Sequence, residues 1–247
     1  MFVLRLAGII LATFISAGVA QPRPQVDLLL VLAADVSNSM DQADFQLQRA
    51  GYAAAFSDSR VISAIQAGPI GRIAVAYVEW SGPWMQKLVV DWTLIDTETA
   101  AYQFSKRLLE EPRAYTKNST SISAAIDYAA KQFAVAPYRA SRWIIDLSGD
   151  GENNTGRPVA EARDDAIADG IAINGLVIVE SVKSGMQPAY SNSVDIEHYY
   201  RTNVIGGGGA FIEVAQGYRS FGAALIRKLV KEIAFGPSLK MSPNFIR

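Results

Sequence analysis

The sequence contains no cysteine, and it has one histidine, His198, among 247 residues. Without cysteine the chain has no disulfides, no thiolate metal site, no iron–sulfur cluster and no cysteine nucleophile. A single histidine excludes a metal site built from several histidines, and any Ser-His-Asp triad would depend on His198 alone. The chemistry open to this chain therefore uses oxygen, from carboxylates, hydroxyls and the backbone.

The chain also lacks an excess of charge of either sign. It has 23 Lys and Arg against 24 Asp and Glu, so its net charge is −1. Such a balance gives no overall attraction to nucleic acid or to anionic membranes, and we expect neither as a partner. Half of the residues are hydrophobic, which is enough to bury a sizeable core. The length fits one large or two small domains.

The first twenty residues are predicted to be a signal peptide. Arg5 precedes an apolar stretch from Leu6 to Ile15, and the small residues Gly18 and Ala20 fit a cleavage site. A membrane anchor would need about 20 consecutive apolar residues, and this run is shorter. No later segment is long and apolar enough to span a bilayer. We therefore expect residues 1–20 to be removed and the mature protein to be exported, either to the periplasm or into the medium.

Strand and helix patterns alternate along the rest of the chain. Short apolar runs predict strands at Val26–Ala34, Ile70–Trp80, Lys87–Leu94, Trp143–Leu147, Ile171–Val179 and Phe211–Val214. Apolar residues at helical spacing predict helices over Phe45–Phe56, Thr97–Leu109, Ile122–Phe133, Pro158–Gly170 and Gly222–Ile233. The short turn Ser81-Gly82-Pro83 makes the second and third strands an antiparallel hairpin.

This order predicts an α/β fold of the Rossmann-like type. We expect an open, mostly parallel six-stranded sheet with one antiparallel edge strand and helices on both faces. No linker or repeat divides the pattern, so it predicts one domain over residues 26–235. Residues 236–247 contain two prolines without periodicity and are expected to be a loosely held tail.

Three oxygen-rich loops are expected at one end of this sheet. Asp35-Val36-Ser37-Asn38-Ser39 follows the first predicted strand, and Asp150 lies in a Gly-Asp-Gly turn after the Trp143–Leu147 strand. Thr120 comes just before the helix that starts at Ile122. The carboxyl ends of parallel strands meet at one edge of a sheet, and ligands bind there. The three loops should therefore lie close together.

Their side chains form an all-oxygen donor set of two carboxylates and three hydroxyls. In an extended loop, residues spaced by two point the same way, as Asp35, Ser37 and Ser39 do. Hard oxygen donors without nitrogen or sulfur suit Mg²⁺, or Mn²⁺ or Ca²⁺, rather than zinc. The sequence thus predicts a metal site formed by Asp35, Ser37, Ser39, Thr120 and Asp150. Neutral hydroxyls leave the ion electrophilic towards an acidic ligand.

Each of these residues also has an ordinary local interpretation. Ser39 with Gln42 matches a capping box, and Thr120 is well placed as a helix N-cap. Asp150-Gly151 alone is a common turn. Capping does not explain why three loops supply compatible ligands at one rim, so we favour the metal site. A metal-free interaction domain, in which the hydroxyls are only caps, is kept as an alternative.

With these motifs the sequence resembles the von Willebrand factor A domain family. That family carries a metal-ion-dependent adhesion site made of Asp-x-Ser-x-Ser after the first strand, a Thr opening a later helix, and an Asp in a strand-end Asp-Gly turn. More narrowly, the stretches Ala76–Gly82 and Tyr199–Gly206, with the closing helix, resemble a family of exported bacterial A-domain-like proteins of unknown function. The resemblance covers essentially the whole predicted domain.

The resemblance implies roles for the five residues. Ser37, Ser39 and Thr120 would coordinate Mg²⁺ directly, Asp35 and Asp150 would act mainly through waters, and an Asp or Glu of a protein partner would complete the shell. Two positions depart from the family's pattern: Asn38 stands where Gly is frequent, and Gly149 stands where a hydroxyl residue often precedes the Asp. Neither removes a ligand, but Gly149 is expected to loosen the support around the site.

An enzyme of a different class is the second hypothesis. Haloacid-dehalogenase-like phosphatases also place an Asp motif after strand one and a Gly-Asp-rich loop after a later strand. Asp35 would then be the nucleophile and Lys131 the charge-neutralising base. The general acid two residues on would be Ser37, which cannot protonate a leaving group at neutral pH. We therefore expect protein binding rather than catalysis.

Two further features are expected near the loops of the predicted metal site, and each has two possible roles. Trp80 and Trp84 flank the hairpin turn, where exposed tryptophans would suit partner binding, although core packing is slightly favoured. The segment Ser181–Val194 leaves the end of a predicted strand. It is either a recognition loop or a solvated connection.

Overall fold

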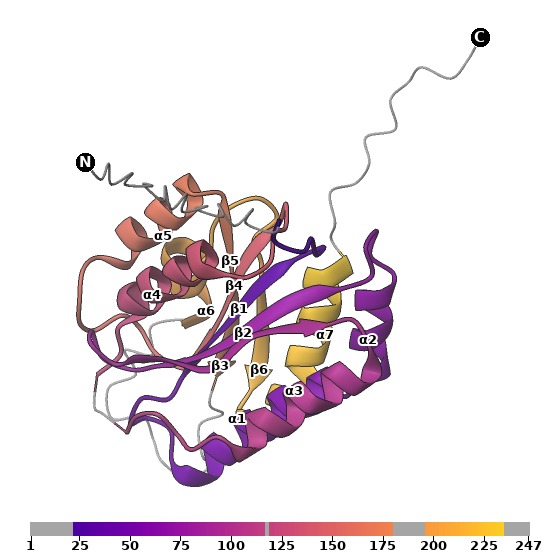
Figure 1. Ribbon diagram of the computed structural model, residues 1–247. Coiled ribbons are helices and arrows are strands. Elements are labelled where there is room, and N and C mark those ends of the chain that lie inside the picture. The colour runs from indigo at the N-terminus through magenta and orange to yellow at the C-terminus, as the bar shows by residue number, and fades with distance from the viewer. Residues whose placement is uncertain (1–21, 117–118, 180–195, 235–247) are drawn as a thin grey trace, which may run out of the picture.

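The six predicted strands form one sheet in the computed structural model, which describes residues 22–116, 119–179 and 196–234 (Figure 1). The strand order is β3-β2-β1-β4-β5-β6, and β3 is antiparallel to its neighbour β2 while the other pairs are parallel. The bounds are β1 (Leu29–Asp35), β2 (Ile73–Trp80), β3 (Gln86–Ile95), β4 (Trp143–Gly149), β5 (Ile171–Val179) and β6 (Ile212–Gln216). The predicted signal peptide, the tail after residue 235 and the Ser181–Val194 segment lie outside the described residues.

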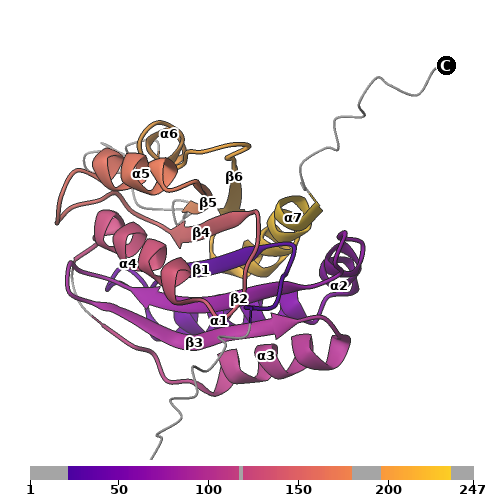
Figure 2. The same ribbon diagram turned by 45° about the horizontal axis from the view of Figure 1, so that its top comes forward.

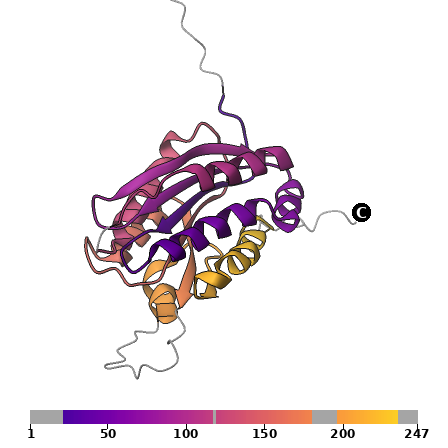
Figure 3. The same cartoon turned by 90° about the horizontal axis from the view of Figure 1, so that it is seen from below.

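Helices cover both faces of the sheet, so the predicted fold class is confirmed (Figure 1, Figure 2). One face carries α1 (Gln42–Phe56), α2 (Ser59–Gln66), α3 (Glu98–Glu110) and α7 (Phe221–Ala234). The other carries α4 (Ile122–Val135), α5 (Val159–Ala168), α6 (Ile196–Tyr199) and the π-helical turn η1 (Tyr200–Val204). A short 3-10 turn, η2 (Tyr218–Ser220), leads into α7. Figure 3 shows α1 and α7 side by side along their face.

The position of β1 explains its uninterrupted apolar sequence. Leu30 and Leu32 pack into the core under α1 and α7, whereas Leu29 and Val31 pack into the core under α4 and α5. A strand that is buried on both faces cannot alternate apolar and polar residues. The sequence pattern therefore identified the central strand of the sheet.

The order of the strands places a topological switch between β1 and β4. From β1 the chain runs outward through β2 and β3, and it then returns to β4 on the other side of β1. The two strands are parallel and paired from Leu29↔Trp143 to Ala34↔Ser148. Consequently the loops that follow β1 and β4 leave the sheet side by side. A switch point of this kind is where open α/β sheets bind ligands.

A cluster of buried charges links α7 to β4. The Lys228 ammonium lies 2.7 Å from Asp146 Oδ1 and also donates to Glu232 Oε1, and all three side chains are buried. Asn174 Nδ2 donates to the same Glu232 oxygen at 2.8 Å. One ammonium thus faces two carboxylates. Burial, and after it the charge of Asp146, raises the pKa of Glu232 to about 7.

This raised pKa predicts that Glu232 makes stability depend on pH. Between about pH 4.5 and 7 the folded protein binds a proton at Glu232 that the unfolded chain does not bind. The contribution is therefore fully present below about pH 4.5 and is lost as the pH rises through about 7. In urea unfolding measured in a chelator, Glu232→Gln should show a smaller loss of stability over this window than the native protein. Equal pH slopes for the two proteins would refute the assignment.

Candidate metal centre

Asp35 ends β1, and hydrogen bonds from three residues hold it and the loop that follows it. Its side chain is 1% exposed, and its Oδ1 accepts a hydrogen bond from the Ser37 backbone N–H at 2.7 Å. Gln48 of α1 donates to the Asp35 carbonyl at 3.1 Å. The Arg113 guanidinium donates to three carbonyl oxygens of the same loop, those of Val36, Ser37 and Met40, at 2.9 to 3.1 Å. The loop therefore has a fixed shape that comes from residues far along the chain.

The two serines of this loop lead directly to Asp150. Ser37 Oγ lies 3.2 Å from Ser39 Oγ, and Ser39 Oγ donates to Asp150 Oδ1 at 2.9 Å. The capping box predicted for Ser39 as the alternative is wrong, because the N-cap of α1 is Asp41, whose carboxylate accepts from Asp44 N–H. The Ser39 hydroxyl thus faces the loop after β4 instead of the helix.

Thr120 joins this group from the segment before α4. A cleft of about 320 Å³ is lined by Ser37, Asn38, Ser39, Thr120 and Asn154. The N-cap of α4 is Ser121, which accepts from Ala124 N–H, so Thr120 is not the cap of that helix. The structure thus brings the three predicted hydroxyl residues into one cleft, with both predicted carboxylates hydrogen-bonded to its serines.

Two carboxylates act on each other in the cleft, and the positive charge of Arg113 only partly offsets their effect on Asp35. Asp35 Oδ2 is buried and has no hydrogen-bond partner among the described residues. Burial, and after it the charge of Asp150, raises the pKa of Asp35 to about 7. A buried carboxylate oxygen without a donor is unfavourable unless a charge or a water compensates it. A divalent cation next to both carboxylates would supply that compensation.

The spacing of the oxygens also fits a small hard cation. Octahedral Mg²⁺ with bonds of about 2.1 Å places adjacent ligand oxygens about 3.0 Å apart. The Ser37–Ser39 and Ser39–Asp150 oxygen pairs are separated by 3.2 and 2.9 Å. Both distances are also ordinary for hydrogen-bonded oxygens, so they are compatible with neighbouring positions around one ion and do not by themselves require it. The described residues contain no group of three or more His, Cys, Asp or Glu that could hold a metal ion.

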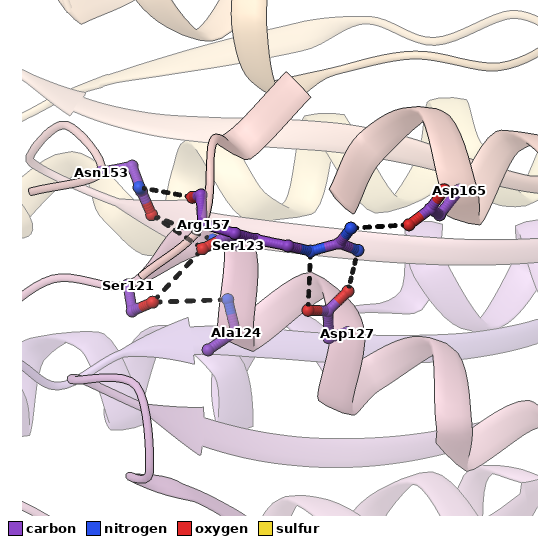
Figure 4. A network of polar contacts seen from close by, with 7 residues as sticks. All are labelled: Ser121, Ser123, Ala124, Asp127, Asn153, Arg157 and Asp165. Carbon is purple, nitrogen blue, oxygen red and sulfur yellow. Dashed lines mark hydrogen bonds and ion pairs between the residues drawn. The ribbon is translucent and has the colours of Figure 1, made fainter. Parts of the chain in front are cut away.

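The loop after β4 holds the backbone of Thr120 in place through Asn154, a contact that the sequence analysis did not predict. Asn154 Oδ1 accepts from Thr120 N–H at 2.9 Å, and Asn154 N–H donates to the Thr120 carbonyl at 3.0 Å. Next to it, Asn153 accepts from Ser123 of α4, and Arg157 bridges α4 and α5 by pairing with one aspartate on each helix (Figure 4). These contacts fasten the loop to the start of α4.

We predict that Asn154→Ala weakens metal binding without unfolding the protein. Loss of a group that supports a ligand typically lowers metal affinity by about 10- to 100-fold, and the change removes the amide that holds Thr120 N–H. Calorimetric titration with Mn²⁺ measures the effect. Asp169→Ala is the control, because Asp169 is an exposed residue at the end of α5 that does not line the cleft. Equal affinities for the two variants would contradict the role of Asn154.

The hairpin between β2 and β3 lies beside Thr120. Ser81 Oγ donates to the Ser119 carbonyl at 2.9 Å, and Ser121 N–H donates to the Ser81 carbonyl at 2.8 Å. Trp80 is fully buried, as predicted, but Trp84 is 94% exposed, so core packing is wrong for the second tryptophan. A groove of about 400 Å³ runs from this indole to α4 and the loop after β4, and its lining includes Pro83, Trp84, Tyr128, Lys131 and Arg157.

Comparison with known proteins gives the family and the fold. Residues 25–236 match the family described as "Protein of unknown function (DUF1194)". The chain belongs to this family. No curated protein matches it. Among the described residues of this DUF1194 protein, no helix combines the length and the apolar character needed to cross a membrane.

Solved structures with the same fold include von Willebrand factor A domains. Proximal thread matrix protein 1 from the mussel byssus is 12% identical with a TM-score of 0.61, covering 86% of this chain and 49% of its own. A structure titled as that protein with a zinc-occupied MIDAS motif is 11% identical with a TM-score of 0.58, at the same coverage. The von Willebrand factor type A protein from Catenulispora acidiphila is 16% identical, with a TM-score of 0.50 and coverage of 85% and 42%.

A bacterial relative of similar length has the same fold. The aerotolerance-related membrane protein from Bacteroides fragilis is 20% identical, with a TM-score of 0.51 and coverage of 83% of this chain and 99% of its own. By contrast, the DUF1194 chain spans about half the length of the mussel protein. The fold is therefore that of a von Willebrand factor A domain, as the sequence resemblance implied.

Proposed function

We propose that this protein is an exported binding domain that holds one divalent cation and, through it, an acidic residue of a protein partner. The observation that carries the proposal is the cleft at the switch point, where Ser37, Ser39 and Thr120 meet two carboxylates. One carboxylate has a buried oxygen with no donor among the residues that the structure describes. Mg²⁺ fits this donor set best, and Mn²⁺ or Ca²⁺ have the same preference for oxygen. When bound, the cation would accept a carboxylate oxygen from the partner. Export rests on the predicted signal peptide.

Two observations support binding rather than catalysis. The position that a phosphatase would give to its general acid is occupied by Ser37, a hydroxyl residue. Lys131, which would have to neutralise charge at Asp35, is exposed on α4 and lines the groove under Trp84, not the cleft of the serines. We therefore expect no hydrolysis of an aryl phosphate. Hydrolysis that is lost in Asp35→Asn would favour the enzyme.

Metal-dependent capture of partners tests the proposed function. The native protein and Asp150→Asn are immobilised side by side and exposed to the exported fraction of the source cells, with Mg²⁺ or with a chelator. We expect the native protein to retain a partner in Mg²⁺ only, and the variant to retain none. A partner that is retained equally in chelator, or equally by the variant, would show that binding does not use the cation.

The exposed indole beside the cleft is the expected partner contact. We predict that Trp84→Ala weakens capture of that partner at least tenfold, because a buried tryptophan in an interface commonly contributes about 2 kcal/mol or more. The same change should alter the free energy of unfolding by no more than about 0.5 kcal/mol, since the side chain is 94% exposed. Tyr102→Ala, which removes an exposed aromatic residue of α3, is the control. Equal capture by both variants would exclude Trp84 from the interface.

A further inference from the structure

Two buried oxygen atoms close to Gly149 have no hydrogen-bond partner among the described residues. One is Asp35 Oδ2, and the other is the hydroxyl of Tyr200, a residue that is completely buried. Neither atom has a hydrogen-bond partner within the part of the chain that the structure describes. Buried polar groups in proteins nearly always have a partner, either a protein atom or an ordered water. Each of these two oxygens therefore needs a hydrogen-bond partner that the described contacts do not supply.

The geometry around Gly149 shows how close the two groups are. A Cβ atom at position 149 would lie 2.4 Å from the Tyr200 hydroxyl and 3.3 Å from Asp35 Oδ2. The phenol oxygen thus occupies the space that a side chain at this position would need, directly beside the Asp35 carboxylate. Glycine at 149 is explained by this close approach.

Two glycines of the sheet leave space for the Tyr200 ring. Gly149 of β4 and Gly175 of the adjacent strand β5 both face it, and a Cβ at 175 would lie 3.1 Å from the ring carbon Cδ1 of Tyr200. Tyr200 itself begins the π-helical turn η1, in which Ile205 N–H donates to the Tyr200 carbonyl at 3.0 Å. Two glycines therefore make a slot that directs one buried hydroxyl to the rim of the metal site.

We propose that the Tyr200 hydroxyl is the hydrogen-bond donor that positions the Asp35 carboxylate at the metal site, in the place of a side chain at position 149. Burial raises the pKa of the Tyr200 phenol, so it keeps its proton at neutral pH. An ionised Asp35 next to a cation would be able only to accept, so the phenol is the donor. The two oxygens make no direct hydrogen bond in this structure, so the donation to Oδ2 runs across one ordered water, while Ser37 N–H holds Oδ1. This inference rests on the proposed function, because it assigns Tyr200 a part in the same site.

Moving the hydroxyl from position 200 to position 149 tests the proposal. Mn²⁺ affinity and the electron paramagnetic resonance spectrum of the bound ion are measured for the full chain. The variants are Tyr200→Phe, Tyr200→Phe with Gly149→Ala, and Tyr200→Phe with Gly149→Ser. Phenylalanine keeps the ring in its slot and frees the space for a Cβ at 149. Alanine then restores the lost volume only, whereas serine restores volume and a hydroxyl.

The expected pattern separates donation from packing. Tyr200→Phe should lower Mn²⁺ affinity about 10- to 100-fold, as the loss of a residue that orients a metal ligand does. The alanine double variant should stay weak, and the serine double variant should return to within about threefold of the native affinity and to the native spectrum. Full affinity in Tyr200→Phe, or equal rescue by alanine and serine, would overturn the role of the hydroxyl.

The native protein is measured first, so that two kinds of failure can be told apart. Native protein that binds no Mn²⁺ would overturn the proposed function and the role of Tyr200 with it. Native protein that binds Mn²⁺ as tightly as Tyr200→Phe would overturn the role of Tyr200 alone and leave the metal site standing. Thermal unfolding of each variant in chelator shows that it is folded before its affinity is compared.

Discussion

Replacement of Asp35 by asparagine is expected to abolish Mg²⁺ and Mn²⁺ binding while the fold keeps its stability. Asparagine has the same shape, and its amide oxygen can still accept from Ser37 N–H, which lies 2.7 Å from Asp35 Oδ1 in the native protein. The change removes the buried negative charge that the proposed cation would compensate. It also removes the carboxylate whose pKa burial and Asp150 raise to about 7. The metal-free variant then has no buried charge at this position at pH 8 and should be at least as stable as the native protein.

Calorimetry and urea unfolding in chelator measure these two effects on the same protein. Asp169→Asn is the matched control, because Asp169 is an exposed aspartate at the end of α5 and does not line the cleft. It should bind Mn²⁺ like the native protein. Equal heats of binding for Asp35→Asn and native protein would exclude Asp35 from the site. A large loss of stability in Asp35→Asn would show that the carboxylate is needed for folding.

Replacement of Lys228 by methionine is expected to cause the largest loss of stability. The ammonium lies 2.7 Å from Asp146 Oδ1 and also donates to Glu232, with all three groups buried. Methionine fills a similar volume but leaves two carboxylates facing each other without a cation. Removing one partner of a buried ion pair typically costs about 3–5 kcal/mol, and urea unfolding at pH 8 should show a loss of this size.

The neighbouring lysine of α7 provides the control for this change. Lys231 is exposed and its ammonium lies 3.8 Å from the centre of the Phe211 ring. An exposed contact of this kind is worth only about 0.5–1 kcal/mol, so Lys231→Met should be mild. Adding Asp146→Asn and Glu232→Gln to Lys228→Met should restore part of the loss, because both uncompensated charges are then removed. Similar losses for Lys228→Met and Lys231→Met would contradict the account.

The elements with strong periodicity could be predicted from the sequence. The apolar run that ends at Ala34 predicted a strand buried on both faces, and the structure confirms β1 there. In contrast, α2 was not predicted, because it has eight residues and buries only Val61 and Ile65. Two buried side chains do not make a recognisable helical pattern. The start of α1 was placed too late for a related reason, since its first turn is polar.

The five candidate ligands could be found because each lies in a loop whose position follows from strand order. The residues that hold these ligands in place could not be found from the sequence. Arg113, Asn154 and Tyr200 reach the site from segments that no local pattern connects to it. A buried lysine such as Lys228 also gave no signal, because lysine at a helical position normally indicates an exposed face. Only tertiary packing reveals such contacts.

Anomalous diffraction from crystals soaked in Mn²⁺ tests the central claim most directly. The account predicts one strong peak per chain in the cleft after β1 and β4, in contact with Ser37, Ser39 and Thr120, and no peak there in crystals of Asp35→Asn. Crystals of native protein without a peak in the cleft, or with Mn²⁺ held only by other residues, would contradict it.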